Sequence, residues 1–187
     1  MIIQYPDLKN KIILVTGATR GIGKTIAESL AIQGAHLVFN YRVGKEEVAE
    51  QFKSKLLEMG AEKVTPLLFD ITNTSEMKDV LTSFSKEYGN ISGLVNNAGV
   101  SKDQLVLRLK EEDVDQIIDT NLKGTLLLTS ILSRQFLKAE NVSVVNLSSV
   151  VGLMGNTSQS AYSASKAGVL GFTKTYAKEL ASKGVRC

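Results

Sequence analysis

Thr16-Gly17-Ala18-Thr19-Arg20-Gly21-Ile22-Gly23 is the stretch of sequence that predicts the fold. It directly follows an apolar run, Lys11–Thr16, and opens an amphipathic run, Ile22–Gln33. Glycines at a strand-to-helix turn let backbone amides approach a pyrophosphate, and the helix N-terminus adds a favourable dipole. The spacing is Gly-x-x-x-Gly-x-Gly, which differs from the general Gly-x-Gly-x-x-Gly pattern of dinucleotide-binding loops. The stretch therefore predicts a phosphate-binding loop, with a plain tight turn as the alternative.

Strand-like and helix-like runs alternate along the chain. The predicted strands are Lys11–Thr16, His36–Asn40, Lys63–Phe69, Ile91–Asn96 and Ser143–Leu147. The predicted helices are Ile22–Gln33, Lys45–Met59, Ser75–Tyr88, Glu111–Phe136 and Ala161–Ser182. Strict alternation predicts an α/β fold in which a doubly wound parallel sheet, Rossmann-like with three αβα layers, carries helices on both faces. Glycines suited to capping a helix C-terminus follow four of these helices, at Gly34, Gly60, Gly89 and Gly184.

Composition narrows the class of protein. A chain of 187 residues, 43% of them hydrophobic, can bury one sizeable core, so we expect residues 1–187 to form a single domain. The net charge of +3 is small and dispersed, which argues against a nucleic-acid partner. One cysteine, Cys187, allows no intramolecular disulfide and no metal cluster, and we interpret the only histidine, His36, as structural. No apolar run approaches the ~20 residues of a membrane span, so we expect a cytoplasmic protein.

The residues that end the second predicted strand indicate which nicotinamide cofactor the loop would hold. An NAD-binding chain places Asp or Glu there to bond the ribose 2′-hydroxyl, whereas Val38-Phe39-Asn40-Tyr41-Arg42 has no carboxylate. Arg42 and the loop residue Arg20 could together clamp a 2′-phosphate, for which guanidinium geometry is well suited. We therefore expect NADP(H) rather than NAD(H), with two solvated surface arginines as the alternative.

Tyr162-Ser163-Ala164-Ser165-Lys166 contains a candidate acid–base pair. Residues four apart share one helix face, so the Lys166 ammonium can lie beside the Tyr162 phenol and favour its charged form. That arrangement makes the phenol a usable proton donor near neutral pH without a histidine. The same spacing occurs at Tyr5/Lys9 and Tyr41/Lys45, but only the third match lies on a predicted helix. The alternative is a half-buried core tyrosine beside a solvated lysine.

Several motifs taken together resemble the short-chain dehydrogenase/reductase family. They are Thr16–Gly23, Asn96-Asn97-Ala98-Gly99, Asn121, Ser149 and the Tyr162/Lys166 pair, whose order and spacing match that family over essentially the whole chain. Ser101–Leu105 and Ser149–Asn156 further resemble the 3-oxoacyl-[acyl-carrier-protein] reductases of fatty-acid synthesis. The resemblance implies NADPH-dependent reduction of a carrier-linked 3-oxoacyl thioester to the 3-hydroxyacyl thioester. The alternatives are an enzyme for another ketone or secondary alcohol, and an NADP-binding module without turnover.

The resemblance also implies roles for four residues. Tyr162 would protonate the substrate carbonyl oxygen as hydride arrives, and Lys166 would support the phenolate and bond the nicotinamide ribose. Ser149 would bind and polarise the carbonyl. Asn121 would kink its helix and hold a water that links Lys166 to solvent. Taken singly, Ser149 could equally be a loop cap and Asn121 a helical residue that bonds its own backbone.

Cofactor contacts follow from the same resemblance. The phosphate loop would contribute Gly17, Ala18, Thr19, Arg20, Gly21, Ile22 and Gly23. Asp70 and Ile71, after the third strand, would contact adenine, and Asn97, Ala98 and Gly99 would line the adenosine-ribose side of the cofactor. The alternatives are helix capping by Asp70 and a tight turn at Asn97-Ala98-Gly99.

Two kinds of partner are implied. Reductases of this kind offer basic side chains to an acidic acyl carrier protein near the active-site entrance, and the candidates here are Arg134, Lys138 and Lys183. The helices Glu111–Phe136 and Ala161–Ser182 form a subunit interface in the family. We therefore expect a homo-oligomer, either a tetramer as in the family or a dimer.

The end of the sequence looks cut short. Gly184-Val185-Arg186-Cys187 resembles the opening of another strand, and members of the family continue beyond it through substrate-loop helices and a final strand. We therefore expect the sheet to lack its last strand or strands and the domain to be incomplete at its C-terminus.

Overall fold

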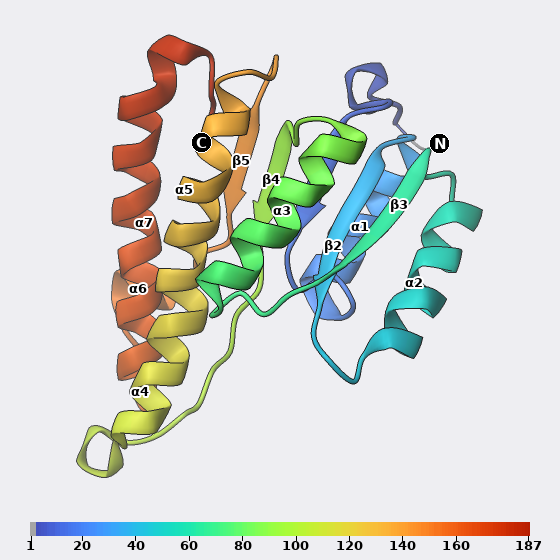
Figure 1. Ribbon diagram of the computed structural model, residues 1–187. Helices are drawn as coiled ribbons and strands as arrows, with labels where there is room; N and C mark the ends of the chain where they lie inside the picture. Colours follow the sequence, from blue (N-terminus) through green and yellow to red (C-terminus); the bar gives the residue numbers. More distant parts are fainter. Residues whose placement is uncertain (1–2) are drawn as a thin grey trace.

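Five parallel strands form one sheet in the computed structural model, which describes residues 3–187 (Figure 1). They are β1 (Ile12–Val15), β2 (His36–Tyr41), β3 (Lys63–Leu68), β4 (Gly93–Asn96) and β5 (Ser143–Asn146). Their spatial order is β3-β2-β1-β4-β5, so the chain steps outward from β1 to β3 and then adds β4 and β5 on the other side of β1. In open α/β sheets, ligands bind at the carboxyl ends of the strands where the order reverses, which here is beside β1.

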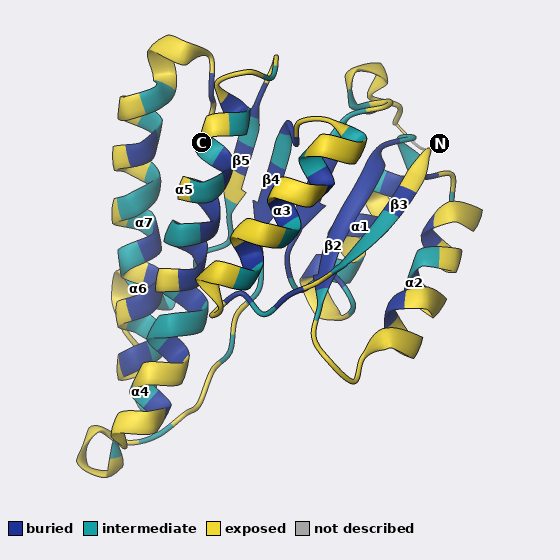
Figure 2. Ribbon diagram, viewed as in Figure 1, coloured by how far each residue is buried: buried dark blue, intermediate teal, exposed yellow. Residues whose placement is uncertain are grey.

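Helices cover both faces of this sheet. The α-helices of the described residues are α1 (Gly21–Ile32), α2 (Glu46–Glu58), α3 (Thr74–Tyr88), α4 (Glu111–Ile118), α5 (Gly124–Phe136), α6 (Val151–Met154) and α7 (Ser160–Leu180). Buried side chains of α1 and α2 form a cluster on one face, and those of α3, α5 and α7 form a second cluster on the other. The predicted doubly wound α/β fold is confirmed (Figures 1 and 2).

Side chains of β1 alternate between the two clusters. Leu14 packs with α3, α5 and α7, whereas Ile13 and Val15 pack with α1 and α2. All three are at most 6% exposed, and each contributes about 1.5–3 kcal/mol of hydrophobic stabilisation. Continuous apolar strands are typical of parallel sheets that are covered on both faces. The central strands are accordingly buried, and exposed residues lie on the outer sides of the helices (Figure 2).

Two helical segments differ from the sequence prediction. The run Glu111–Phe136, predicted as one helix, is α4 and α5 joined by a π-helical turn, Asp119–Lys123. A π turn widens the helix by one residue, and here it contains Asn121, the residue expected to kink the helix. The short helix α6 is not among the predicted elements, because four residues cannot show helical periodicity.

The residues after α7 return to the edge of the sheet. A 3₁₀ turn, Ala181–Lys183, ends at Gly184, which has φ +75°, as expected of a C-terminal cap. The Arg186 amide donates to the Val142 carbonyl at 3.1 Å, and the Arg186 carbonyl accepts from the Val144 amide at 2.8 Å. Arg186 thus forms an isolated parallel bridge with Ser143 of β5, at the position where the sequence predicted the opening of another strand. Within residues 3–187, no helix has both the length and the apolar character needed to cross a bilayer.

Candidate functional site

The predicted phosphate loop joins β1 to α1 at the carboxyl end of the sheet. Gly17 has φ +63°, and a Cβ atom on it would lie 3.0 Å from Ala98 Cα. A Cβ atom on Gly23, in the first turn of α1, would lie 2.5 Å from the Gly17 carbonyl oxygen. Both close approaches require glycine. The first amides of α1 have no partner within the helix, so the compact loop presents donors suited to a phosphate.

Asn97 and Thr16 join this loop to the segment after β4. The Asn97 side-chain amide donates to the carbonyls of Thr16 (2.9 Å) and Gly17 (3.1 Å). The Thr16 hydroxyl accepts from the Asn97 and Ala98 amides, both at 3.0 Å, and donates to the Val95 carbonyl at 3.3 Å. The structure therefore brings the predicted residues Asn97 and Ala98 directly against the phosphate loop. Thr16 has a wider role than the sequence indicated, although a threonine at a strand end was a usable signal.

Asn40, at the end of β2, joins the loop to the segment after β3. Its Oδ1 accepts from the Gly17 amide at 3.2 Å, and its Nδ2 donates to the Phe69 carbonyl at 3.1 Å. The side chain is 9% exposed, so these bonds lie largely out of water. The sequence analysis used Asn40 only as a missing carboxylate and missed this positioning role.

Arg42 and Asp70 lie together at the edge of this region. Arg42 Nη1 is 3.8 Å from Asp70 Oδ2, and two-thirds of the arginine side chain is exposed. Asp70 Oδ1 accepts from both the amide and the hydroxyl of Thr72 at 2.8 Å. A small surface cavity is lined by Arg42, Val43, Leu68, Asp70 and Glu76. An exposed guanidinium at the rim of a cavity fits an anionic group such as a 2′-phosphate.

Lys166 is buried beside Tyr162 in the first turns of α7. Its side chain is 5% exposed, and Nζ donates to the Leu147 carbonyl at 2.7 Å. Nζ also lies 5.7 Å from the centre of the half-buried Tyr162 ring. Burial lowers the pKa of Lys166 from its ordinary value of 10.5. The alternative of a solvated lysine is therefore wrong, because this ammonium lies inside the protein.

The segment that carries Ser149 is fixed against the same turn of α7. The Ser148 hydroxyl donates to the Lys166 carbonyl at 2.8 Å. Gly152 in α6 packs so closely that a Cβ atom there would lie 2.9 Å from the Ala167 amide nitrogen. Ser149 itself accepts a long bond from the Val151 amide at 3.4 Å. Ser149, Tyr162 and Lys166 thus belong to one packed unit.

Asn121 connects the π turn to the segment after β4. Its Oδ1 accepts from the Val100 amide at 2.8 Å, and its Nδ2 donates to the Val100 carbonyl at 2.9 Å and to Ser165 Oγ at 3.2 Å. Gly99 lies beside it, since a Cβ atom there would be 3.2 Å from Asn121 Oδ1. The bonds to Val100 and Ser165 show that the side chain links segments and does not cap its own backbone.

The remaining predicted cofactor residues fall into two groups. Ala18 and Ile71 are buried. Ile71 packs against Gly124, because a Cβ atom on Gly124 would lie 2.9 Å from the Ile71 carbonyl oxygen. Arg20 and Ile22 are exposed, and Ile22 is 67% exposed on the first turn of α1. Of the other two loop residues, Gly21 is exposed and Thr19 is partly buried.

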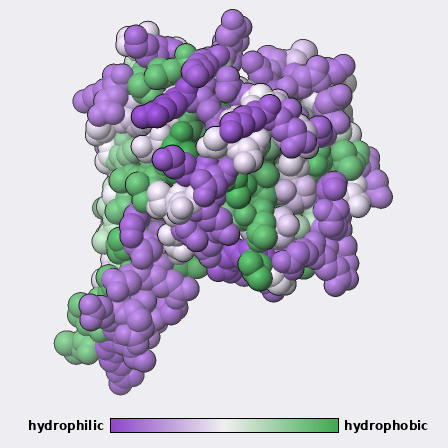
Figure 3. Space-filling view, in the orientation of Figure 1, coloured by the Kyte–Doolittle hydropathy of each residue, from purple (hydrophilic) through white to green (hydrophobic). Residues whose placement is uncertain are grey.

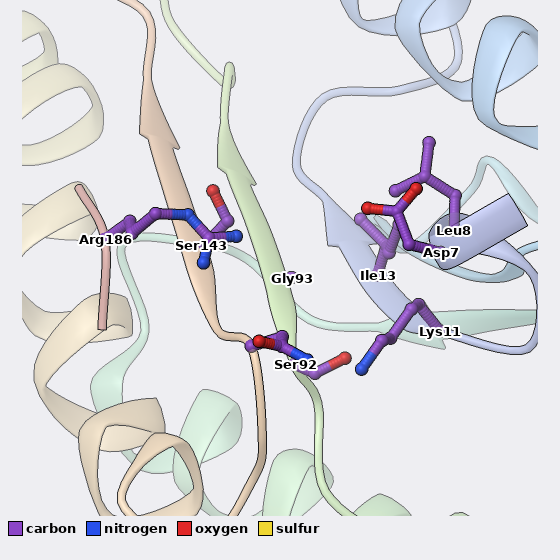
Figure 4. Close-up of a pocket in the computed structure, with 9 residues that line it drawn as sticks. Asp7, Leu8, Lys11, Ile13, Ser92, Gly93, Ser143 and Arg186 are labelled. Atoms are coloured by element: carbon purple, nitrogen blue, oxygen red, sulfur yellow. The ribbon is translucent and has the colours of Figure 1, made fainter. Parts of the chain in front are cut away.

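A separate cavity lies at the opposite end of the strands. It crosses Ile13 near the start of β1, Gly93 at the start of β4 and Ser143 at the start of β5, with Lys11 and Arg186 at its sides (Figure 4). The predicted site residues all follow the carboxyl ends of strands or belong to the helices there. This cavity is therefore remote from the candidate site.

The basic residues proposed for carrier docking also lie at that opposite end. Lys183 follows the C-terminus of α7, whereas Tyr162 is in its first turn. At about 1.5 Å per residue, the two are roughly 30 Å apart along the helix. Arg134 and Lys138 lie at the C-terminal end of α5, beside the same end of α7 (Figure 1). Within one chain, the prediction that these cations flank the site entrance is wrong.

Exposed apolar side chains occur near the candidate site instead. Val150, Leu153 and Met154 of the Ser149 segment are 65%, 75% and 80% exposed. The 3₁₀ turn Val106–Arg108 belongs to a projection at the lower left, which is apolar at its left edge (Figures 1 and 3). Leu107 in this turn is 93% exposed. The exposed apolar side chains thus lie in or next to two short helical segments, α6 and the 3₁₀ turn Val106–Arg108.

Comparison with known proteins gives consistent matches. The model of the short chain dehydrogenase family matches residues 11–187. The 3-oxoacyl-[acyl-carrier-protein] reductase of Staphylococcus epidermidis is 42% identical over 179 residues, which cover 94% of this chain and 71% of the relative. The enzyme of the same name from Thermotoga maritima is also 42% identical, with 96% and 72% covered.

A solved structure agrees with these sequence matches. A protein of Sinorhizobium meliloti, described as a short-chain alcohol dehydrogenase, superposes with a TM-score of 0.88 at 31% identity, with 95% of this chain and 69% of that chain covered. The fold is thus shared with a protein described as a member of the same enzyme family. The chain belongs to the short-chain dehydrogenase family of NAD(P)-dependent oxidoreductases.

Proposed function

We propose that this chain reduces 3-oxoacyl thioesters, linked to acyl carrier protein, to 3-hydroxyacyl thioesters with NADPH as the reductant. The observation that carries the proposal is the buried Lys166 ammonium, 5.7 Å from the Tyr162 ring, in a unit that also holds the Ser149 segment. The names of the two bacterial reductases supply the substrate class. The proposal treats residues 1–187 as one NADP-binding domain that carries the catalytic residues.

Each residue of the unit has a chemical task in this reaction. NADPH, when bound, supplies the hydride. The Tyr162 phenol donates a proton to the carbonyl oxygen, and the nearby Lys166 ammonium stabilises the phenolate left behind. Ser149 donates a hydrogen bond to the same oxygen, where negative charge develops. Asn121 keeps the π turn and the Val100 segment in place behind Lys166, and a water held at this turn would return protons to it.

The preference for NADPH rests on the end of β2. Asn40 carries no charge, and its side chain bonds Gly17 and Phe69, so the end of β2 supplies no carboxylate for the ribose 2′-hydroxyl of NADH. Arg42 is exposed beside a cavity, where its guanidinium can pair with a 2′-phosphate. We expect Arg42→Ala to weaken NADPH binding at least tenfold and to change NADH binding less than twofold. Equal losses for both cofactors would contradict the assignment.

A direct assay tests the reaction. The purified chain, given NADPH and acetoacetyl thioester, should oxidise the cofactor. The turnover rate of Tyr162→Phe should be at least 100-fold lower, whereas its NADPH binding should be unchanged. NADPH binding without turnover in the unmodified chain would favour the alternative of a nucleotide-binding module. Rates should then be compared for carrier-linked and simple thioesters, since a carrier partner predicts a lower KM for the former.

A second candidate function is oxidation or reduction of another secondary alcohol or ketone. It is favoured by the structural match to a protein described as a short-chain alcohol dehydrogenase. The same acid–base residues serve both reactions, so substrate profiling separates them. A simple ketone used better than every 3-oxoacyl thioester would support this candidate.

We also propose that copies of the chain associate through the outer surfaces of α4, α5 and α7. The relatives' names do not state an assembly, so this part of the proposal rests on the family resemblance. Sedimentation velocity at micromolar concentration should show a dimer or tetramer, and a monomer would contradict the proposal. A cytoplasmic location remains a prediction from the sequence.

A further inference from the structure

The residues after β4 make more contacts than the candidate mechanism uses. Asp103 accepts two hydrogen bonds from Gln159 Nε2, at 3.1 Å to Oδ1 and 3.2 Å to Oδ2. The partners are 56 positions apart in the sequence. Gln159 is the N-cap residue of α7, and Tyr162 lies in the first turn of that helix. A side-chain contact therefore joins the segment after β4, residues 101–104, to the start of the helix that holds the candidate proton donor.

The backbone strengthens the same junction. The Gln104 amide donates to the Ser158 carbonyl at 2.7 Å, and residues 104 and 159 form an isolated parallel bridge. Ser158 has φ +66°, a left-handed conformation that costs a non-glycine residue of the order of 1 kcal/mol. The surrounding bonds must hold Ser158 in that conformation. The Ser163 amide in turn donates to the Gln159 carbonyl at 2.7 Å, which begins the hydrogen bonding of α7.

The segment of residues 101–104 also bonds to α4. Lys102 Nζ pairs with Asp113 Oδ1, and Gln104 Nε2 donates to Asp113 Oδ2 at 3.2 Å. Asp113 is a buried carboxylate, 7% exposed, so these two donors satisfy a charge that water reaches poorly. Val100, just before this segment, bonds Asn121 twice. Residues 101–104 thus lie between α4 and the start of α7 and bond to both.

We propose that Asp103 and Gln159 form a clasp that positions Tyr162 for proton transfer, so that both are positioning residues and neither touches the reacting atoms. The inference rests on the proposed role of Tyr162. Ser101 Oγ donates to Asp103 Oδ1 at 2.7 Å and orients the carboxylate toward Gln159. Hydrogen bonds from Ser101 and Gln159 lower the pKa of Asp103, so the acceptor stays charged in the neutral pH range.

The clasp has a kinetic signature that a general structural role lacks. Displacing a proton donor slows the chemical step but leaves the cofactor loop untouched, because Thr16–Gly23 is held by separate bonds. Asp103→Ala and Gln159→Ala should each lower kcat about tenfold, with NADPH Kd and substrate KM unchanged within twofold. The double variant should be no slower than either single variant, because both remove one interaction.

Conservative and control variants sharpen this test. Asp103→Asn keeps an acceptor oxygen and should retain kcat within threefold of the unmodified chain. Gln51→Ala is a matched control, since Gln51 Nε2 also donates to an exposed carboxylate, Glu47, at 3.1 Å on the distant helix α2. It should leave kcat unchanged. The clasp would be overturned if the losses in kcat of the two single variants multiplied in the double variant. It would also be overturned if KM rose while kcat stayed unchanged.

Amide hydrogen exchange tests the clasp without turnover. In Asp103→Ala, exchange in residues 160–165 should be at least fivefold faster than in the unmodified chain and in Gln51→Ala. Unchanged exchange there would refute the clasp whatever the assays show. If exchange accelerates but the unmodified chain reduces no 3-oxoacyl thioester, the clasp stands and the proposed function fails.

Discussion

The two halves of the candidate site are built differently. On the cofactor side, Thr16, Asn40 and Asn97 cross-link the segments that follow β1 to β4, and glycines allow near-contact between backbones. On the substrate side, the proton-transfer residues are packed around Lys166, but Leu153 and Met154 next to them are largely exposed. The segments proposed to bind the cofactor and to transfer the proton are thus tightly packed, whereas the apolar side chains proposed to face the substrate lie in solvent.

The largest effect is expected from a substitution in the phosphate loop, which should weaken cofactor binding. Gly23→Ala would place a methyl group 2.5 Å from the Gly17 carbonyl oxygen, so the phosphate loop must move. We expect NADPH binding to weaken at least 100-fold, measured by quenching or enhancement of cofactor fluorescence. Gly171→Ala is the control, because nothing lies within 4 Å of a Cβ atom at that helical position. It should raise the free energy of unfolding by about 0.5–1 kcal/mol. Equal binding by the two variants would show that the loop is not as tightly packed as described.

A smaller loss is expected at Asn40. Asn40→Ala leaves the Gly17 amide and the Phe69 carbonyl without their partner, which costs about 1–3 kcal/mol of unfolding free energy. NADPH affinity should fall about tenfold because the loop is less well held. Urea denaturation and cofactor titration measure the two effects. Loss of stability with unchanged affinity would separate Asn40 from the cofactor side.

The stability of the protein in acid is expected to depend on His36, at the start of β2. This effect involves neither half of the candidate site. Burial, with Lys63 nearby, lowers the pKa of His36 from 6.5, so below that pH the unfolded chain binds a proton that the folded chain does not. The free energy of unfolding should therefore fall by up to about 1.4 kcal/mol for each pH unit below 6.5 until the folded residue also titrates. His36→Gln should flatten this dependence in denaturation curves recorded between pH 5.5 and 7. If the unfolding free energy of the variant depended on pH as steeply as that of the unmodified chain, other groups would cause the effect.

The smallest effect on stability is expected on the substrate side. Leu153 is 75% exposed, so Leu153→Ser should change the free energy of unfolding by less than about 0.5 kcal/mol. If this residue contacts an acyl chain, KM should rise severalfold for long acyl thioesters and little for acetoacetyl thioester. The same KM change for both lengths would remove Leu153 from the substrate surface.

The sequence predicted most of the architecture because the apolar runs are long and regularly interrupted. All five strands and the helices that cover them occur where the alternation placed them, and the glycine cap at Gly184 has the expected positive φ. The π turn at Asp119–Lys123 was anticipated only as a kink at Asn121, because its position depends on side-chain bonds to Val100. Helix α6 was missed because it is a single turn.

The candidate site was predicted less evenly. Tyr162 and Lys166 could be paired from helical spacing, and the glycine loop could be read from its position after a strand. The hydroxyl of Thr16 and the amide of Asn40 were not assigned their roles, because their partners lie on strands that are distant in sequence. The carrier-docking cations were misplaced for the opposite reason. They lie at the ends of helices that are close to the site in sequence, but α7 has 21 residues, and Lys183 comes after its last turn whereas Tyr162 is in its first.

Thr16 has a consequence for motion. One buried hydroxyl accepts hydrogen bonds from the amides of Asn97 and Ala98 and donates to the Val95 carbonyl, so three bonds at one side chain join the end of β1 to the end of β4. A ligand that widened the gap between them would break all three bonds at once. The ends of β1 and β4 are therefore expected to move together as one body when a ligand binds beside them.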